Sequence, residues 1–370
     1  MVFPPALSGF LPLVAAFLLA AAPACAEDCP PPEAWSYRLG KGLHLGDSGV
    51  WLGGYANVLV EDLKNTSWQA QLNDLSLFVG WERGRWRFFS EFEVGDGLTA
   101  GNGRALSTHQ GYFNLERLYL DFRVENAFNV RFGKFLTPIG RWNQIHAAPL
   151  VWTTSSPLIV DGPFAMHTTG GMAYGNFEAF DTLWGYSVYG GGRNQFDFKS
   201  PDESTDDNYQ DPIGFRLFQD SPGLFQAGLS YAHYSERYFH RGVKNLVGLD
   251  AFWTRKRYEV SGEFIYRFGS GITNPVYDAR DGIGNLWGLY VQGVAPLVGD
   301  LYAVARYEAF QREGAASVGN LWLAGLAYRP QPALVFKAEY RFADYSDKNP
   351  PTKVFGGFTE GFAASVAVLF

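Results

Sequence analysis

Several features that define other protein classes are scarce or missing in this sequence. Only two cysteines, Cys25 and Cys29, occur among 370 residues, and after residue 26 no apolar run approaches the ~20 residues that a membrane helix needs. Acidic residues outnumber basic ones, 37 against 30, which argues against nucleic acid as a partner. The six histidines are scattered without the spacing of metal ligands. We therefore expect no membrane helix, no metal site and no cofactor.

The first 26 residues are predicted to be a secretory signal peptide. Residues 11–22, LPLVAAFLLAAA, are uncharged, and the small residues Ala24 and Ala26 stand where a signal peptidase reads its cleavage site. The usual positive n-region is absent. A transmembrane anchor would need a longer apolar run, and a lipoprotein signal at Cys25 would need a leucine three residues earlier. Cleavage after Ala26 leaves a single cysteine, which excludes an internal disulfide.

The rest of the chain is rich in glycine and aromatic residues and alternates between apolar and polar positions. Glycine numbers 43, and aromatic residues make up 17% of the sequence. A period of two indicates strands with two different faces, and it recurs in RWRFFSEFEV (85–94), ERLYLDFRV (116–124), YEVSGEFIYRF (258–268) and FKAEYRF (336–342). A soluble β-sandwich also alternates, but it needs no aromatic residues near strand ends, where a bilayer interface holds them. The pattern favours an all-β fold, a transmembrane antiparallel β-barrel.

About sixteen strands are predicted after a short periplasmic lead-in at 27–48, so the barrel occupies 49–370. Tight turns are expected at 82–85, 125–127, 221–223, 255–257, 298–300 and 331–333, and long links at 95–113, 136–165, 195–212, 270–285 and 346–360. Short turns face the periplasm in such barrels, and long loops face outward. The predicted strands are 49–60, 68–81, 86–94, 114–124, 128–135, 167–178, 183–194, 213–220, 224–235, 245–254, 258–269, 286–297, 301–311, 320–330, 334–345 and 361–370.

The chain ends in FAASVAVLF, a strand with no polar face and no solvating tail. In a barrel the last strand pairs with the first, so both of its edges are bonded. Its alternate residues Phe362, Val366, Val368 and Phe370 would then face lipid. The terminal Phe370 looks like the C-terminal signal of outer-membrane proteins that the barrel assembly machinery reads.

One stretch resembles a known family. NVRFGKFLTPIGRWN (129–143) resembles the strand and loop entry of porins related to the phosphate-selective (O/P-like) porin family, through Gly133, Lys134, Phe135, Pro138 and Gly140. The resemblance implies a homotrimeric, water-filled channel in the bacterial outer membrane. Physically, Pro138 and Gly140 would turn the chain out of the sheet.

Phosphate selectivity does not follow from that resemblance, because the side chains expected to line the pore carry both signs in equal number. A balanced wall aligns water and polar solutes with only weak preference for one ion sign. The expected cross-strand partners Glu91 with Arg117, and Asp121 with Arg131, would offset each other. The lining set is Arg87, Arg117, Arg123, Arg131, Arg267, Arg306, Lys337 and Arg341 against Glu91, Glu93, Asp121, Asp250, Glu259, Glu263, Glu308 and Glu339.

The link at 136–165 is predicted to fold into the barrel as a constriction loop. It is long, and it is too apolar to stand in water, so its side chains need a wall to pack against. Arg141 and Asp161 would help to set the narrow passage, while Trp142 and Trp152 would anchor the loop. A lid over the mouth and a contact between trimer subunits are the alternatives.

The predicted function is passive diffusion of small hydrophilic solutes or ions through the outer membrane. One alternative is a barrel that sheathes or docks a periplasmic partner such as a cytochrome, although the chain has no haem-binding motif of its own. A lipid-modifying barrel enzyme would need a Ser–His pair with an orienting acid, and His233 near Ser230 and Ser235 lacks the acid. The acidic stretch 200–211 lacks calcium-loop spacing and indicates a solvated external loop.

Overall fold

The computed structural model describes residues 35–64, 68–101, 104–108, 111–160, 163–192, 209–221, 225–236, 242–269, 285–312, 318–344 and 360–370. The predicted signal peptide, Asp161 and residues 200–208 of the acidic stretch 200–211 lie outside these residues. Within the described part of the chain, no helix has the length and apolarity to cross a membrane.

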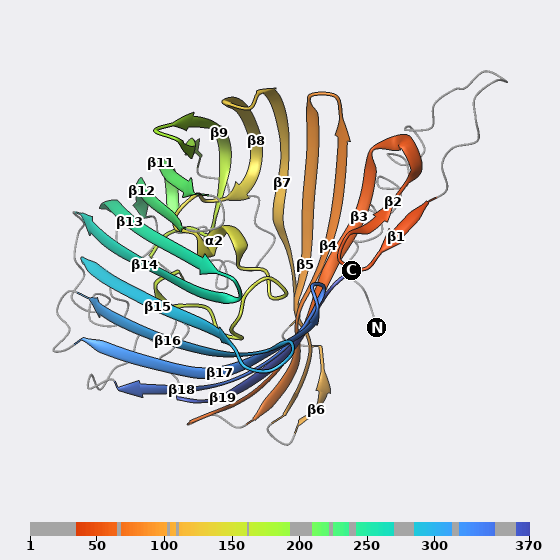
Figure 1. The fold of residues 1–370 in the computed structure, drawn as a ribbon, viewed down its shortest axis with the longest axis vertical. Coiled ribbons are helices and arrows are strands. Elements are labelled where there is room, and N and C mark those ends of the chain that lie inside the picture. Colours follow the sequence, from red (N-terminus) through yellow and green to blue (C-terminus); the bar gives the residue numbers. More distant parts are fainter. Residues whose placement is uncertain are drawn as a thin grey trace.

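A closed barrel of sixteen antiparallel strands forms the body of the molecule (Figure 1). The circle closes where β19 pairs with β3. The strands of the barrel are β3 (Val50–Leu63), β4 (Gln69–Arg83), β5 (Trp86–Gly101), β7 (Tyr112–Glu125), β8 (Phe128–Leu136), β9 (His167–Ala179), β10 (Thr182–Gly191), β11 (Tyr209–Ser221), β12 (Phe225–Glu236), β13 (Gly242–Arg255), β14 (Tyr258–Gly269), β15 (Leu286–Pro296), β16 (Leu301–Arg312), β17 (Gly319–Gln331), β18 (Leu334–Asp344) and β19 (Gly361–Leu369).

The sequence predicted each of these strands, and the differences lie at their ends. β5 runs on to Gly101, where the sequence predicted an end at residue 94. Its added length pairs with β4, from Gly95 opposite Asp74 to Gly101 opposite Gln69, and with the short β6 (Arg104–Ser107). The predicted link at 95–113 is therefore partly sheet. Glycine-rich residues with weak strand preference hid this extension.

The lead-in contains a small hairpin that joins the barrel. Its strands are β1 (Ser36–Arg38) and β2 (Gly42–His44), followed by the short helix η1 (Gly46–Ser48). β2 pairs with the start of β3. This hairpin lies at the end of the barrel that carries the short turns.

The two faces of the strands differ as the alternation predicts. Outward side chains are apolar and exposed, for example Leu77 (49%), Phe132 (61%) and Val291 (50%). Charged side chains on the other face are almost wholly buried inside the barrel, for example Asp121 and Glu308. Apolar groups facing outward and polar groups facing the lumen are typical of membrane-spanning barrels.

The C-terminal strand fits between two neighbours along its whole length. β19 pairs with β18 on one side and β3 on the other. The backbone of Phe370 exchanges two hydrogen bonds with Gly54, of 2.8 and 2.9 Å. Phe362 points outward, with an exposed fraction of 43%, whereas Ala363 and Ala367 are fully buried. A polar tail is unnecessary because both edges of the strand are bonded.

Candidate channel lumen

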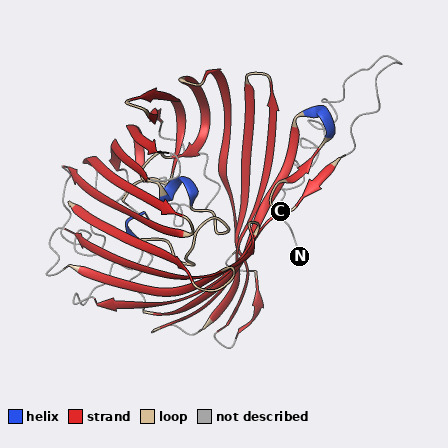
Figure 2. Cartoon of the chain, in the orientation of Figure 1, coloured by secondary structure: helices blue, strands red, loops and turns tan. Residues whose placement is uncertain are grey.

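The chain between β8 and β9 runs through the inside of the barrel. It includes α2 (Trp142–Ile145) and η2 (Leu158–Val160), and Figure 2 shows both short helices within the ring of strands. Its described residues, 137–160 and 163–166, contact the inner faces of strands from β11 to β19. We call this segment the inner loop.

The first part of the inner loop is fixed by a carboxylate of β14. Glu263, which is 4% exposed, accepts hydrogen bonds from the backbone N–H groups of Arg141, at 3.0 Å, and Trp142. The Tyr290 hydroxyl donates to the same carboxylate at 3.1 Å. The N–H of Gly140 bonds to the Ser230 hydroxyl at 3.2 Å. Backbone donors that would otherwise lack partners at the start of α2 are thus satisfied by the wall.

Two further carboxylates hold the second half of the inner loop. Glu339 accepts from the N–H groups of Thr154 and Ser155, at 2.7 and 3.0 Å. Glu308 accepts from the N–H of Leu158 at 2.6 Å. These charged acceptors form stronger hydrogen bonds than neutral ones would.

Basic side chains of the same wall bond to the loop's oxygen atoms. Arg306 donates to the Thr153 hydroxyl at 2.8 Å, and it also donates to Glu308 at 2.7 Å. The Lys337 ammonium donates to the carbonyls of Ala148 and Thr153, at 3.0 and 2.9 Å. Acceptors and donors therefore alternate along the wall, matching the polarity of the loop backbone.

Apolar packing closes the interface between the loop and the wall. The loop contributes Trp142, which is 5% exposed, to a buried cluster whose wall residues come from β11 to β15. Trp152 is held by its indole N–H, which donates to Glu259 at 3.0 Å, and its ring lies 4.8 Å from that of Tyr302. The cluster that includes Trp142 comprises Ile139, Trp142, Val151, Ile159, Val160, Phe164, Ala165, Tyr209, Ala232, Tyr234, Leu246, Ile265 and Tyr290.

The inner faces of β3 to β9 form a different wall, which we call the open wall. Asp121 lies opposite Arg131 in the register of β7 and β8, and the guanidinium binds the carboxylate with two hydrogen bonds of 2.7 and 2.9 Å. Glu91 lies opposite Arg117 and accepts a hydrogen bond from it. Both predicted cross-strand pairs are confirmed.

The remaining predicted lining residues also face inward, in pairs or clusters. Arg87 donates to Glu82 at 3.3 Å, near the short-turn end. Arg341 donates to Glu61 at 3.1 Å across the closure of the barrel. Arg267 pairs with Glu236 at 3.2 Å.

Two wall residues that the sequence did not single out, Arg216 and Arg329, hold the interior together. Arg216 binds Asp250 with both guanidinium nitrogens. Arg329 donates to the loop carbonyls of Pro149 and Val151, each at 2.8 Å. Alternation within the predicted strand places Arg216 on the inward face. Nothing in the sequence links Arg329 to a loop 180 residues away.

Two further side chains of the inner loop, Arg141 and His146, lie against different parts of the barrel wall. The Arg141 guanidinium lies 3.9 Å from the centre of the Phe252 ring. His146 sits near Glu116, Glu91 and Arg117 of the open wall, and burial lowers the pKa of its imidazole, an effect that those two carboxylates oppose. The imidazole is therefore neutral at pH 7.

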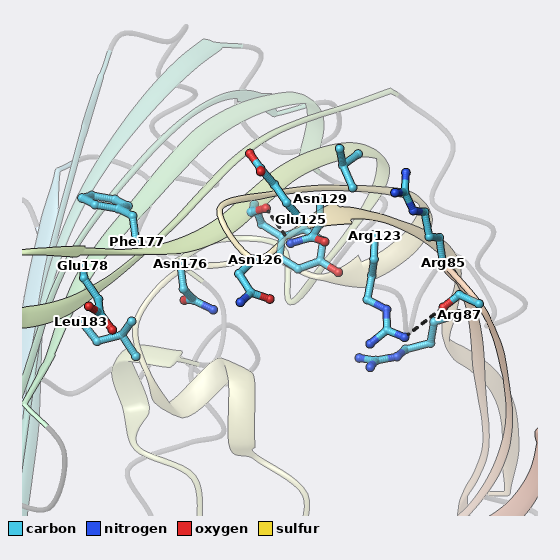
Figure 3. Close-up of a pocket in the computed structure, with 13 residues that line it drawn as sticks. Arg85, Arg87, Arg123, Glu125, Asn126, Asn129, Asn176, Phe177, Glu178 and Leu183 are labelled. Carbon is cyan, nitrogen blue, oxygen red and sulfur yellow. Dashed lines mark hydrogen bonds between the residues drawn. The ribbon is translucent and has the colours of Figure 1, made fainter.

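A cavity of about 850 Å³ lies at the short-turn end, between β5 and β10. Arg87 and Arg123 lie side by side on one flank, and Phe177 and Glu178 lie on the other (Figure 3). Arg123 is fixed by the Gly84 carbonyl at 3.3 Å and by Glu82. Among the described residues there is no cluster of His, Cys, Asp or Glu that would hold a metal ion.

Comparison with known proteins supports the fold. No family model and no curated protein matches the sequence. OmpF of Salmonella typhi, in complex with daunomycin, has a TM-score of 0.61 at 12% identity, over 91% of this chain and 100% of that chain. An anion-selective porin from Comamonas acidovorans has a TM-score of 0.60 at 13% identity, over 87% and 99% of the chains.

A further neighbour is OmpT of Vibrio cholerae in a trimer form, with a TM-score of 0.57 at 11% identity, over 87% of this chain and 99% of that chain. At these identities the likeness concerns the fold. The closed barrel with its apolar outer face is that of a bacterial outer-membrane protein, and its architecture is that of the porins.

Proposed function

We propose that this protein is an outer-membrane channel for passive diffusion of small hydrophilic solutes or ions. The observation that carries the proposal is the unequal filling of the barrel: the inner loop is bound to the wall from β11 to β19, whereas the open wall carries charged pairs. A sixteen-strand barrel is wide enough for an aqueous channel unless its interior is filled. A loop bound to one side narrows such a channel without closing it.

The predicted lining residues divide into two groups in this proposal. Arg87, Glu91, Arg117, Asp121, Arg131 and Arg341 line the aqueous path. Glu263, Arg306, Glu308, Lys337 and Glu339 hold the inner loop and set the width of the path through it. Arg141 and Trp142, with Trp152 and Asp161, form the constriction.

Weak ion selectivity follows from the paired charges of the open wall, because each guanidinium lies beside a carboxylate. A homotrimer is proposed from the trimer form of a similar barrel. A relationship to the phosphate-selective porins is part of the proposal, on the motif at 129–143, but phosphate selectivity is not. Phe370 is proposed to direct the chain to the barrel assembly machinery.

The lipid-modifying enzyme is less well supported. His233 contacts Asn245, at 3.0 Å, whereas Ser230 faces inward and bonds to the inner loop. The two side chains lie on opposite faces of β12, so they do not form a nucleophile–base pair. A barrel that docks a periplasmic partner would yield that partner in a pull-down from native membranes.

Planar-bilayer recording of the purified protein tests the proposal. In KCl we expect discrete current steps and a small reversal potential under a salt gradient. Electrophoretic migration that changes when the sample is heated shows that the barrel is folded. Folded protein that inserts into the bilayer and passes no current would contradict the channel.

A further inference from the structure

Aromatic side chains form a continuous row on the open wall. Trp51 of β3, Phe89 of β5 and Tyr119 of β7 occupy one level of the barrel, because the register sets Trp51 opposite Gly80, Gly80 opposite Phe89, and Phe89 opposite Tyr119. Ring centres are 5.9 Å apart between Trp51 and Phe89 and 5.5 Å apart between Phe89 and Tyr119. We call this row the aromatic platform.

Glycine at position 80 makes the row continuous. A Cβ atom there would stand 2.1 Å from the indole of Trp51. The indole therefore lies over the glycine backbone and fills the gap between β3 and β5. Any larger residue on β4 would separate Trp51 from Phe89.

Two guanidinium groups stack on rings of the platform. Arg117 lies 4.7 Å from the ring centre of Phe89, and Arg131 lies 3.7 Å from that of Tyr119 and 5.2 Å from that of Tyr174 on β9. From β3 to β9 the platform crosses five strand spacings, about 24 Å at ~4.8 Å each. Its flat groups are rings and guanidinium planes, and each guanidinium is paired with a carboxylate.

Packing alone does not account for the platform. On the wall that carries the inner loop, apolar side chains such as Leu246, Ile265 and Leu323 are no more than 2% exposed, since the loop covers them. Trp51, Phe89 and Tyr119 are only half-buried. Large flat apolar groups that remain accessible inside an aqueous lumen indicate a surface for a ligand.

We propose that the aromatic platform is a binding site for neutral oligosaccharides, an inference that rests on the proposed channel function. The apolar C–H face of a pyranose ring stacks on aromatic rings, while its hydroxyl groups both donate and accept hydrogen bonds. The pairs Glu91–Arg117 and Asp121–Arg131 offer donors through their partly exposed guanidinium groups, while their carboxylates are buried. Because these pairs balance in charge, they favour a neutral ligand over an anion or a cation.

The cavity at the short-turn end continues the same surface. Tyr174 belongs both to the edge of the platform and to the lining of the cavity, which also presents Asn126, Asn129 and Asn176. Amide side chains carry a donor and an acceptor each, as sugar hydroxyls require. A saccharide that leaves the platform at β9 therefore enters a second polar site at the periplasmic mouth.

Single-channel recording in KCl with added maltotriose tests the platform. We expect saturable interruption of the current by the sugar in the wild-type protein. Phe89→Leu keeps apolar volume on the wall but removes the flat face, so the dissociation constant should rise roughly fivefold, and Trp51→Ala should act in the same direction. Phe88→Ala is the matched control, since Phe88 lies next in sequence on the lipid-facing side, and it should leave the constant unchanged.

Calorimetric titration of the detergent-solubilised protein with maltotriose separates this inference from the channel itself. Folded protein that passes KCl current but neither binds maltotriose nor shows sugar-dependent interruptions would overturn the platform and leave the channel standing. Interruption by benzoate and not by maltotriose would also overturn it, in favour of an aromatic anion. Sugar binding without KCl current would support the platform and remove the channel.

Discussion

The two walls of the barrel use similar side chains for different purposes. On β14, β16 and β18 the carboxylates of Glu263, Glu308 and Glu339 accept hydrogen bonds from loop backbone. On β5 and β7 the carboxylates of Glu91 and Asp121 bind arginines of the next strand. An inward-facing charge therefore marks the lumen, but only its partner distinguishes a side chain that holds the loop from one that meets solute.

Removing the inner loop should have the largest effect on conductance, because both walls would then face the aqueous channel. Replacing residues 143–158 by a short Gly/Ser link removes the backbone that Glu308 and Glu339 bind. We expect single-channel conductance to rise severalfold, measured in planar bilayers. The barrel should still migrate differently before and after heating. Unchanged conductance in a folded deletion variant would place the loop outside the conducting path.

Removing one of the side chains that hold the inner loop should also raise the conductance, but by less. Glu339→Ala leaves the N–H groups of Thr154 and Ser155 without their acceptor, at a cost of about 1–3 kcal/mol for each group that stays buried. We expect greater current noise and a conductance increase of less than about twofold. Glu91→Ala, on the open wall, is the matched control, and it should leave the noise unchanged. Equal noise in the two variants would refute the division between the walls.

Charge changes on the open wall should shift ion selectivity with little change in conductance. Arg131→Ala leaves the charge of Asp121 unbalanced, so the reversal potential under a KCl gradient should move toward cations. Asp121→Ala should move it toward anions. If neither substitution shifts the potential, these two residues do not line the pore.

Acidification should have the smallest effect on the channel current, and this effect should come from protonation of His146. Burial lowers the pKa of this imidazole below its ordinary value of about 6.5. The packed loop then binds fewer protons than the released loop, so the stability that packing provides is complete above about pH 6.5 and falls as the pH drops through the lowered pKa. Current noise should rise with acidification in the wild-type protein and much less in His146→Gln. The same pH dependence in both proteins would contradict this role.

The sequence predicted the strands, and the register of β5 with β7 and of β7 with β8, because both depend on local pattern. The alternation in β5, β7 and β8 sets which residues face inward, and the tight turn after β7 fixes Asp121 opposite Arg131. The anchoring contacts were not predictable, since Thr154 meets Glu339 across 185 residues of sequence. Such contacts depend on how the closed barrel places a loop, and alternation carries no information about that.

The aromatic platform was missed for a related reason. Alternation in 85–94 and 116–124 places Phe89 on the face of Glu91 and Tyr119 on the face of Asp121, but it does not show that the two rings are neighbours. Their alignment with Trp51 depends on Gly80, whose missing side chain leaves room for the indole. A glycine inside a strand can mark close approach by a neighbour, and that was the available signal.

A disulfide between loop and wall tests the central claim, that the inner loop lies against one half of the barrel. The hydroxyl oxygens of Thr154 and Ser365 are 3.1 Å apart, which suits a disulfide after small adjustments. In a Cys29→Ser background, the double substitution Thr154→Cys with Ser365→Cys should oxidise in the folded barrel to a bridge. Because Ser365 and Ser76 are buried in the fold, thiol labelling is measured after denaturation, and the bridge should block it. Thr154→Cys with Ser76→Cys, on β4 of the open wall, should remain fully labelled. Labelling of both cysteines in the first variant, after the folded barrel has been oxidised, would contradict the account.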